Sequence, residues 1–554
     1  MNHAPYHTAM EAAPERRSEE EPFRFRVVVA GAGFAGVYCA QALGRALGHR
    51  RGSKEVALIS ARNTMEFQPM LPEVCGSEVS PRHVVNPIRR LCREVTVMRG
   101  RIVKIDLPAR RLTLNAGPYS GNRVVEFEHL ALSIGSVVDL SRVPGMPEHA
   151  YLIGNVGDAM ALRGAIIDRF EEATLAAKRE SVRRLLTFVV VGGGYSGVET
   201  AGQIADLAAD VSHLYPKLSL EDIRVVLVHS GPHLLPEIGE RLGRYAESEL
   251  GKRRVEVILN TRVSAMTASK VYFKWGGSLE SFTVVSTVGI APHPLVTQLC
   301  QENGIETVKG RIITEATLRV PGHPCLWSAG DCASIPLPDG RKAPPTAQFA
   351  VREGRLMGGN LARVLNGAAP RPFDYKGVGE LANIGRRTAV ADIFGLQFSG
   401  FFAWWLWRTV YLAKLPGLDR KLRVVIDWTL DLFFPRDISL LNPQGKRLVQ
   451  EMHLEAKDRL FQAGEPALSF YFVRSGSVEL RDENGELRRT IREGEHFGER
   501  ALLTDRVWRF DAFATGPSDV VALDADLFDQ LQACRAFHEV VERSAGAPPP
   551  SKAP

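Results

Sequence analysis

Cysteine, long apolar runs and strong net charge are all scarce in this chain of 554 residues. Its seven cysteines are scattered without a Cys-x-x-Cys pair, so neither a disulfide scaffold nor a metal site is indicated, and a reducing compartment is expected. No run reaches the roughly 18 apolar residues that a membrane-spanning helix needs. The net charge of +6 suits anionic cofactors or an anionic membrane surface but is too small to indicate nucleic acid as a partner.

The two ends of the chain have the composition of unfolded segments. Residues 1–22 are polar and acidic and lack the apolar stretch of a signal peptide, so we expect a disordered leader. Residues 545–554 are rich in proline and alanine, and a disordered tail is expected there. The length between them is too great for one hydrophobic core, so several domains are expected.

A dinucleotide-binding fingerprint follows the first apolar strand. A β-branched run at 26–30 leads into Gly31, Gly33 and Gly36, and an alanine- and leucine-rich helical pattern continues to residue 47. The first glycine permits a tight turn, the second lets the backbone approach a pyrophosphate, and the third lets helix and strand pack closely. The next strand, 55–60, ends in Ser60 where a ribose-binding acid is usual, and a serine hydroxyl is a weaker partner for a ribose.

The same fingerprint occurs a second time. The strand 188–191 leads into Gly192, Gly194 and Gly197, and the following strand, 223–228, is succeeded by His229 instead of an acid. His229, with Arg224 and the pair at 253–254 nearby, would tolerate the 2′-phosphate of NADPH, and NADH stays open as well. Two fingerprints indicate two dinucleotides, commonly one flavin and one nicotinamide nucleotide.

A later Gly-Asp pair fits the flavin. The short strand 326–328 is followed by Gly330 and Asp331 at a predicted helix start, where an acid can meet a ribityl hydroxyl and the helix end can face phosphate. A simple turn is the alternative interpretation of this pair.

Six segments together resemble a type II NADH:quinone oxidoreductase of the flavoprotein superfamily with two dinucleotide-binding domains. They are residues 31–36, 67–74, 132–136, 192–199, 329–331 and 344–348. A seventh, 373–390, resembles the region that precedes the membrane-facing end in that family. The resemblance covers about residues 24–440 in unbroken order. It implies an FAD-binding domain in two parts, 23–182 and 306–395, and an NAD(P)-binding domain at 183–305.

The resemblance also implies roles for individual residues. Glu199 matches the family's glutamate beside the flavin and nicotinamide, and a solvated glutamate in the first helical turn is the alternative. Gln348 matches the residue that lines the quinone pocket, although Arg352 stands where the family usually repeats a glutamine. The residues expected to contact FAD or NAD(P)H are Gly31, Gly33, Gly36, Ser60, Gln68, Pro69, Gly192, Gly194, Gly197, His229, Asp331 and Ala347.

The stretch 396–440 has the composition of a membrane-surface anchor. Residues 401–412 hold three tryptophans, basic residues from Arg408 to Arg423 follow, and Asp427 and Asp431 then lie one turn apart on a helix whose other face is apolar. Tryptophan beside basic residues and an amphipathic helix suits binding through 401–434 to an anionic lipid surface. A dimer interface or a buried core is the alternative.

From about residue 447 to residue 540 the chain resembles a cyclic-nucleotide-binding β-roll. Short alternating strands with turn signals precede Gly498 and Glu499, and a closing helix is predicted at 527–531. In that family the glutamate binds the ribose and an arginine pairs with the cyclic phosphate. Trp508 occupies the arginine's position here, with Arg509 next to it, so a cyclic nucleotide as ligand stays open.

The sequence therefore predicts an α/β protein with two Rossmann-like domains that bind FAD and NAD(P)H, a short amphipathic membrane-binding helical segment and a C-terminal β-roll. The function we expect is hydride transfer from NAD(P)H to flavin and electron transfer to a membrane quinone, without proton pumping. We expect a homodimer on the cytoplasmic face of the cell membrane. Two alternatives remain: a soluble flavoprotein reductase with another acceptor, and a redox or nucleotide sensor.

Overall fold

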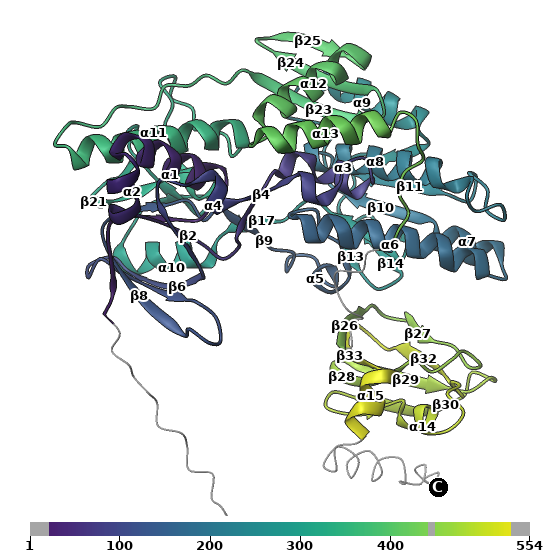
Figure 1. Ribbon diagram of the computed structural model, residues 1–554. Coiled ribbons are helices and arrows are strands. Elements are labelled where there is room, and N and C mark those ends of the chain that lie inside the picture. The colour runs from purple at the N-terminus through teal and green to yellow at the C-terminus, as the bar shows by residue number, and fades with distance from the viewer. Residues whose placement is uncertain (1–20, 441–448, 533–554) are drawn as a thin grey trace, which may run out of the picture. The chain divides into compact units, whose positions relative to one another are not determined.

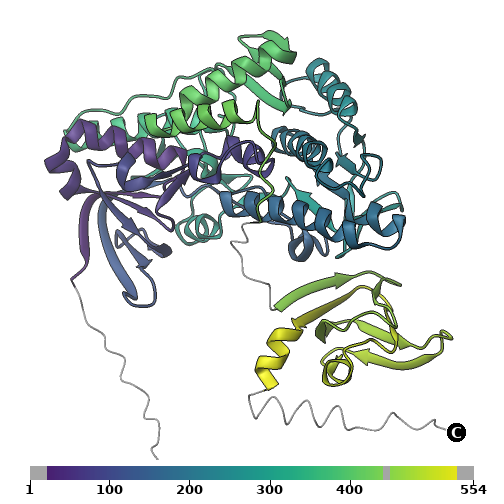
Figure 2. The same cartoon turned by 45° about the vertical axis from the view of Figure 1, so that its right-hand side comes forward.

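The structure is a computed structural model that describes residues 21–440 and 449–532 (Figures 1 and 2). These residues form two compact units, each assembled from separated stretches of chain. The first unit takes the described residues up to Met65, with Pro87–Ser136 and Pro292–Lys376. The second takes Glu66–Asn86, Val137–Ala291 and the described residues from Gly377 onward. The predicted tail and nearly all of the predicted leader lie outside the described residues.

A mainly parallel sheet forms the core of the first unit. Strand β1 (Phe23–Ala30) lies between β8 (Asn122–Leu132) and β2 (Val56–Ser60) and runs parallel to both. Val27 and Val29 join one hydrophobic cluster and Val28 and Ala30 join another, because alternate side chains of a strand point to opposite faces. The other strands joined to this sheet are β5 (Thr96–Arg99), β6 (Arg101–Asp106), β7 (Arg111–Asn115), β20 (Arg319–Val320) and β21 (His323–Ser328).

Two long helices lie against each other in the first unit (Figure 1). Helix α1 (Phe34–Leu47) begins directly after the first fingerprint, and α11 (Ala347–Leu365) packs along it. A Cβ on Gly354 or Gly358 would collide with backbone carbonyl oxygens of α1, so these glycines permit the close contact. Shorter elements complete the unit: α2 (His49–Glu55), α4 (Ile88–Leu91), α10 (Pro294–Asn303), β18 (Thr307–Val308), β19 (Arg311–Ile313), η3 (Gly330–Cys332) and β22 (Ala333–Ser334).

The prediction of a helix start at Gly330 and Asp331 is wrong in detail. These residues form the three-residue 3-10 turn η3, and β22 follows at once. The next helix in the chain is α11, which begins at Ala347. Four short strands lie near the points where the chain passes between units: β3 (Thr64–Glu66), β4 (Val85–Pro87), β9 (Ser136–Val138) and β17 (Ile290–Pro292).

A second parallel sheet forms the centre of the second unit. Strand β10 (Thr187–Val191) is buried along its whole length and pairs with β11 (Arg224–Val228) and β16 (Thr283–Ser286), and β12 (Val255–Ile258) lies at the edge beyond β11. Helix α8 (Tyr195–Ser212) follows the second fingerprint. The remaining elements of this region are α5 (Met146–His149), α6 (Val156–Leu175), α7 (Arg179–Leu185), α9 (Glu240–Lys252), β13 (Val263–Met266), β14 (Lys270–Phe273) and β15 (Ser278–Glu280).

An antiparallel sheet and two helices cover α8. Strand β23 (Gly379–Gly385) packs on α8 because Gly202 leaves room for the carbonyl oxygen of Ile384. Helices α12 (Gly400–Lys414) and α13 (Leu418–Leu430) follow, and no helix among the described residues is long and apolar enough to cross a membrane. The other elements here are β24 (Thr388–Ile393), β25 (Leu396–Ser399), η1 (Gln68–Met70), α3 (Leu71–Cys75) and η2 (Pro81–His83).

The last described residues form the predicted β-roll, which is drawn in yellow-green in Figure 2. Its two four-stranded sheets enclose an aromatic core that includes Phe461, Tyr471, Phe497 and Trp508. The fold class predicted from the sequence, two Rossmann-like domains and a β-roll, is thereby confirmed. The elements are β26 (Val449–Leu454), β27 (Arg459–Phe461), β28 (Ser469–Ser475), β29 (Ser477–Arg481), β30 (Leu487–Arg492), β31 (His496–Phe497), α14 (Glu499–Leu503), β32 (Asp511–Ala514), β33 (Ser518–Asp524) and α15 (Ala525–Gln532).

Candidate functional site

The three glycines of the first fingerprint have different surroundings. Gly31 has a positive φ of 99°, and a Cβ there would collide with the Ser133 carbonyl. A Cβ on Gly36 would collide with the carbonyl oxygen of Gly31. A Cβ on Gly33 would meet no other described atom within 4 Å. Folding therefore requires the first and third glycines, whereas the backbone at Gly33 is open to a ligand.

The second fingerprint repeats this arrangement. Gly192 has a φ of 118°, and a Cβ there would collide with the Thr287 hydroxyl. A Cβ on Gly197 would collide with the carbonyl oxygen of Gly192. A Cβ on Gly194 would meet only Glu237 Oε1, at 3.8 Å, among the described residues. Each unit thus holds one open glycine between two sterically required ones.

Both open glycines stand at helix N-termini. Gly33 precedes α1 and Gly194 precedes α8, and neither helix start has a capping hydrogen bond from a described side chain. The first backbone N–H groups and the positive end of the helix dipole are therefore available to an anion. This geometry fits the pyrophosphate of a dinucleotide in each unit. The residues present thus fit FAD in the first unit and a nicotinamide nucleotide in the second.

Two carboxyl groups lie around the Gly-Asp turn of the first unit. Asp331 accepts a hydrogen bond from Ser136 Oγ at 3.2 Å, and burial raises the pKa of its carboxyl. Glu353 on α11 accepts the N–H of Gly330 at 2.8 Å, and burial raises the pKa of Glu353 to about 7. Glu353 was not predicted from the sequence, because its contact with Gly330 joins residues 23 positions apart. Ser60 stands at the end of β2, where its Oγ accepts the N–H of Arg62 at 3.3 Å.

Gln68 and Pro69, predicted to lie near the flavin ring, belong to the second unit. They form the 3-10 turn η1, which leads directly into α3. Gln68 Nε2 donates to the carbonyl oxygen of Gly154 at 3.2 Å. This bond fixes the turn to the segment that precedes α6.

His229 lies against the second fingerprint and accepts a hydrogen bond from its backbone as a neutral imidazole. Its Nδ1 accepts the N–H of Gly193 at 3.1 Å, and burial lowers the pKa of its imidazole. The expectation that Arg224 and Arg253 gather there is wrong. Arg224 opens β11, at the end away from the fingerprint, and pairs with Glu256 at 2.7 Å. Arg253 donates to the backbone of Glu249 and to Thr388. Neither arginine therefore serves a 2′-phosphate at this site.

Glu199 is buried on α8 and is not the solvated glutamate of the alternative interpretation. Its side chain lies on the helix face covered by β23, where Oε1 accepts the N–H of Asn383 at 2.9 Å. Burial raises the pKa of Glu199 to about 8, and the Asn383 bond opposes this shift. A carboxyl group with this pKa can hold or release a proton near neutral pH.

The predicted quinone-pocket residues begin α11 in the first unit. Ala347 is its first residue, and Gln348 Oε1 accepts a hydrogen bond from the Tyr375 hydroxyl at 3.2 Å. The Arg352 guanidinium lies 4.1 Å from the centre of the Tyr375 ring and donates to the carbonyl of Gln348 at 3.0 Å. Arg352, which departs from the family pattern, thus supports Tyr375 and the first turn of α11.

The aromatic stretch divides between core and surface. Trp404, Trp407 and Trp428 are buried, so the expectation that these rings lie at lipid level is wrong for them. Asp427, on the protein-facing side of α13, accepts the N–H of Ser80 at 3.0 Å. Other residues of α12, of α13 and of the stretch directly after α13 are exposed, and we call them the exposed apolar set: Phe401, Phe402, Trp405, Leu418, Leu422, Val425, Ile426, Leu430, Leu432, Phe433 and Phe434.

Arg408 does not belong to the surface cations predicted from the sequence. It forms an ion pair with Glu78 and lies between the rings of Trp404 and Trp428, 4.0 and 4.6 Å from their centres. A guanidinium can stack on aromatic faces while it binds a carboxylate, which a surface lysine rarely does. Arg408 therefore supports the fold of α12 and α13 from inside.

The β-roll holds the predicted ribose carboxylate, and Trp508, at the sequence position of the family's arginine, is buried in its core. Glu499 is buried, and its Oε2 has no hydrogen-bond partner among the described residues. The Trp508 indole stacks on Phe461 with ring centres 3.7 Å apart and comes within 3.1 Å of where a Cβ on Gly498 would stand. Arg509 points to the surface, 3.5 Å from Asp505. Glu499 could accept from a ribose hydroxyl.

The part of the chain that the structure describes contains neither a candidate metal site nor a disulfide bond. No group of three or more histidine, cysteine, aspartate or glutamate side chains there could hold a metal ion. The six described cysteines are all free, and Cys534 lies outside the described residues.

Three family models match the chain. The model described as pyridine nucleotide-disulphide oxidoreductase matches residues 25–354, and the NDH2 C-terminal domain matches residues 377–437. The cyclic nucleotide-binding domain matches residues 451–533. These three ranges follow one another along the chain and together contain both fingerprints, α12, α13 and the β-roll.

Known proteins and a solved structure are also similar to this chain over most of its length. The type II NADH:quinone oxidoreductase Ndh of Mycobacterium tuberculosis is 30% identical over 460 residues, 81% of this chain and 95% of that protein. NdhA of the same organism is 32% identical over 419 residues, 73% of this chain and 86% of that protein. NDH2 from Plasmodium falciparum, solved in complex with NADH, aligns with a TM-score of 0.69 at 18% identity over 75% of this chain and 99% of that chain, and shows the shared fold.

Proposed function

This chain belongs to the type II NADH:quinone oxidoreductases, and on that premise we propose that it passes a hydride from NADH to FAD and two electrons onward to a quinone. The reaction is a non-proton-pumping NADH dehydrogenase activity. The observation that carries the proposal is the matched pair of fingerprints, each with an open middle glycine at an uncapped helix start. Two such anion sites suit two dinucleotides, one in each unit.

In this reaction the protein's own groups bind and orient the flavin and the nicotinamide nucleotide. When bound, the flavin supplies the two-electron chemistry. Gly33 and the start of α1 would hold its pyrophosphate, Asp331 would accept from its ribityl chain, and Gln68 and Pro69 would line its ring. Gly194 and the start of α8 would hold the nicotinamide nucleotide. Glu199, buried and able to be protonated near neutral pH, would supply a proton on the quinone side.

We propose NADH instead of NADPH as the donor. A 2′-phosphate needs a cation, and the imidazole of His229 is kept neutral by burial and uses Nδ1 to accept from Gly193. Arg224 and Arg253 are engaged elsewhere.

A membrane quinone is favoured over a soluble acceptor by the exposed apolar set on α12 and α13. A large exposed apolar surface on a soluble protein marks an interaction site. Because the acidic side of α13 is engaged with the protein, the apolar side is left for the surroundings, as in a helix that lies in the membrane plane. Gln348 and Ala347 are the residues proposed to line the quinone pocket. Binding at the cytoplasmic face of the membrane and assembly into a homodimer stay predictions. Light scattering of the purified chain would measure its oligomeric state.

For the β-roll we propose a regulatory role that does not use a cyclic nucleotide. This proposal is supported by the Trp508 indole, which lies against Gly498, and by Arg509, which pairs outward with Asp505.

The experiment that tests the main proposal follows NADH oxidation by the purified full chain with a short-chain quinone and with ferricyanide. Quinone-dependent turnover is expected, and turnover with ferricyanide alone would favour the soluble reductase.

A further inference from the structure

A buried carboxyl group of the first unit holds the turn that carries Asp331. Glu353 on α11 is 2% exposed, and its Oε2 accepts the backbone N–H of Gly330 at 2.8 Å. A buried N–H group needs a partner, and here the partner is a side chain from a helix that comes later in the chain. The same contact fixes the orientation of the peptide group that leads into the turn. No step of the proposed reaction uses the Glu353 carboxyl.

The turn η3 depends on such an outside contact. It has only three residues, and it begins at Gly330, whose φ of 76° lies in the left-handed region. Glycine reaches this region and several others at little cost, so the backbone alone does not select one conformation. Asp331 is the next residue, and the direction of its side chain follows from the conformation at Gly330. The bond between Gly330 and Glu353 therefore sets where the Asp331 carboxyl points.

The residue after Glu353 fastens α11 to α1. A Cβ on Gly354 would collide with the carbonyl oxygen of Ala35, which lies in the first turn of α1. Gly330 is close to the same place, because a Cβ there would come within 3.3 Å of the Ala35 Cβ. Two adjacent residues of α11 thus contact the Asp331 turn and the start of α1. The helix holds these two segments in a fixed position relative to each other.

Both of these segments belong to the FAD site proposed above. The start of α1 at Gly33 would hold the pyrophosphate, and Asp331 would accept from the ribityl chain. These two parts of FAD are joined directly to each other, so the groups that bind them must be placed correctly relative to one another. A site that already has this arrangement loses less conformational entropy when it binds. A residue that fixes the arrangement therefore raises the affinity for FAD without contacting it.

We propose that Glu353 is a positioning residue of the FAD site, which holds η3 so that Asp331 faces the ribityl chain. This inference rests on the proposed function. Glu353 acts through Asp331, and its carboxyl needs only an acceptor oxygen for this role. Both the ionised and the protonated carboxyl provide one, and so does the amide of glutamine. The proposal therefore concerns the hydrogen bond to Gly330 and not the charge of Glu353.

The affinity for FAD of four full-length holoenzymes tests this role, the wild type and three variants. Serial dilution, with the released flavin measured by its fluorescence, gives the Kd for FAD. Glu353→Met removes the acceptor at similar side-chain volume, and its Kd is expected to rise about tenfold because the turn loses one buried hydrogen bond. Glu353→Gln keeps the acceptor, so its Kd should stay within about twofold of the wild-type value.

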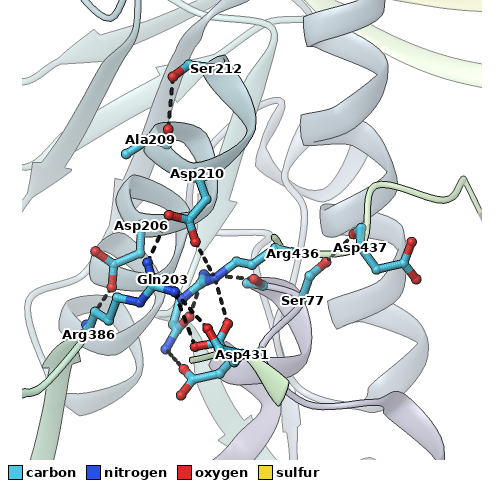
Figure 3. A network of polar contacts seen from close by, with 12 residues as sticks. Ser77, Gln203, Asp206, Ala209, Asp210, Ser212, Arg386, Asp431, Arg436 and Asp437 are labelled. Carbon is cyan, nitrogen blue, oxygen red and sulfur yellow. Dashed lines mark hydrogen bonds and ion pairs between the residues drawn. The ribbon is translucent and has the colours of Figure 1, made fainter. Parts of the chain in front are cut away.

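The third variant, Asp206→Leu, is the matched control. Asp206 on α8 likewise accepts a backbone N–H, that of Arg386, at 2.6 Å, but it lies outside the segments proposed to contact FAD (Figure 3). Its loss should lower the stability of the protein without changing the Kd for FAD. If Asp206→Leu weakens FAD binding as much as Glu353→Met does, the effect is a general loss of stability and the proposal is wrong.

A double-mutant cycle with Asp331→Ala shows whether Glu353 acts through Asp331. In the Asp331→Ala background, Glu353→Met is expected to raise the Kd by less than about twofold. Losses that multiply would overturn the proposal, as would a Glu353→Gln protein that binds FAD as weakly as Glu353→Met. If Glu353→Met does not fold, Glu353→Asp replaces it, because its carboxyl is one methylene too short to reach Gly330. Wild-type protein that binds no FAD would instead refute the proposed function.

Discussion

Gly197 packs directly against the carbonyl oxygen of Gly192, so that no side-chain atom fits between the first and third glycines of the second fingerprint. Gly31 and Gly36 have the same relationship in the first unit. In both, the middle glycine is the one free of this constraint. The fingerprint thus separates into positions required by the fold and a position open to the ligand.

Two alanine substitutions should distinguish these roles. Gly197→Ala is expected to destabilise the protein by about 1–3 kcal/mol, because its Cβ overpacks against backbone. Gly194→Ala should cost less than about 1 kcal/mol, because φ there is −77° and the space is open, yet it should raise the KM for NADH about tenfold or more by blocking phosphate approach. Thermal unfolding and steady-state kinetics check this. Equal loss of stability in the two variants would contradict the assignment.

The carboxyl of Glu353 should make the stability of the protein fall with rising pH. Burial raises its pKa from 4.5 to about 7. A raised folded-state pKa gives stability that is complete below the unfolded value and is lost as the pH rises through the folded one. Relative to Glu353→Gln, the free energy of unfolding of wild type should drop by roughly 3 kcal/mol between about pH 4.5 and pH 7. Denaturant titrations at several pH values measure this, and parallel curves for the two proteins would refute it.

Membrane association should depend on the exposed apolar set. Replacing Trp405 and Phe433 by aspartate is expected to weaken binding to anionic liposomes about a hundredfold, since each buried aromatic side chain contributes roughly 1.5–3 kcal/mol. Trp275→Asp is the control, because Trp275 has an exposed fraction between those of Trp405 and Phe433 but lies after β14, outside the set. Flotation reports the bound fraction. If the control floats as poorly as the double variant, the apolar set is not the membrane-binding surface.

The β-roll should give no binding heat with cyclic AMP or cyclic GMP. Trp508, at the sequence position of the family's phosphate-binding arginine, is buried and carries no charge, and Arg509 pairs outward with Asp505. Isothermal calorimetry with the full-length chain tests this at ligand concentrations up to about 1 mM, which would detect any binding as strong as about −4 kcal/mol or stronger. Heat that disappears in Glu499→Ala would show that the roll binds a nucleotide after all.

The fold was predictable because its signals are local. Each fingerprint places strand, glycine turn and helix within about twenty consecutive residues, where steric rules apply directly. The chemistry of Glu353 and Arg408 was not predictable, since it is created by contacts between distant parts of the chain. Arg408, for example, pairs with Glu78, 330 positions away. Surface and core residues of α12 also alternate within one aromatic run, so composition alone could not separate Trp404 from Trp405.

The most direct test of the account is the absorbance spectrum of the purified full-length protein during two successive additions. We expect an oxidised flavin spectrum that NADH bleaches at once, that NADPH bleaches at least about tenfold more slowly, and that a short-chain quinone then restores. A colourless folded protein that takes up no FAD, or a bound flavin that NADH leaves oxidised, would contradict it.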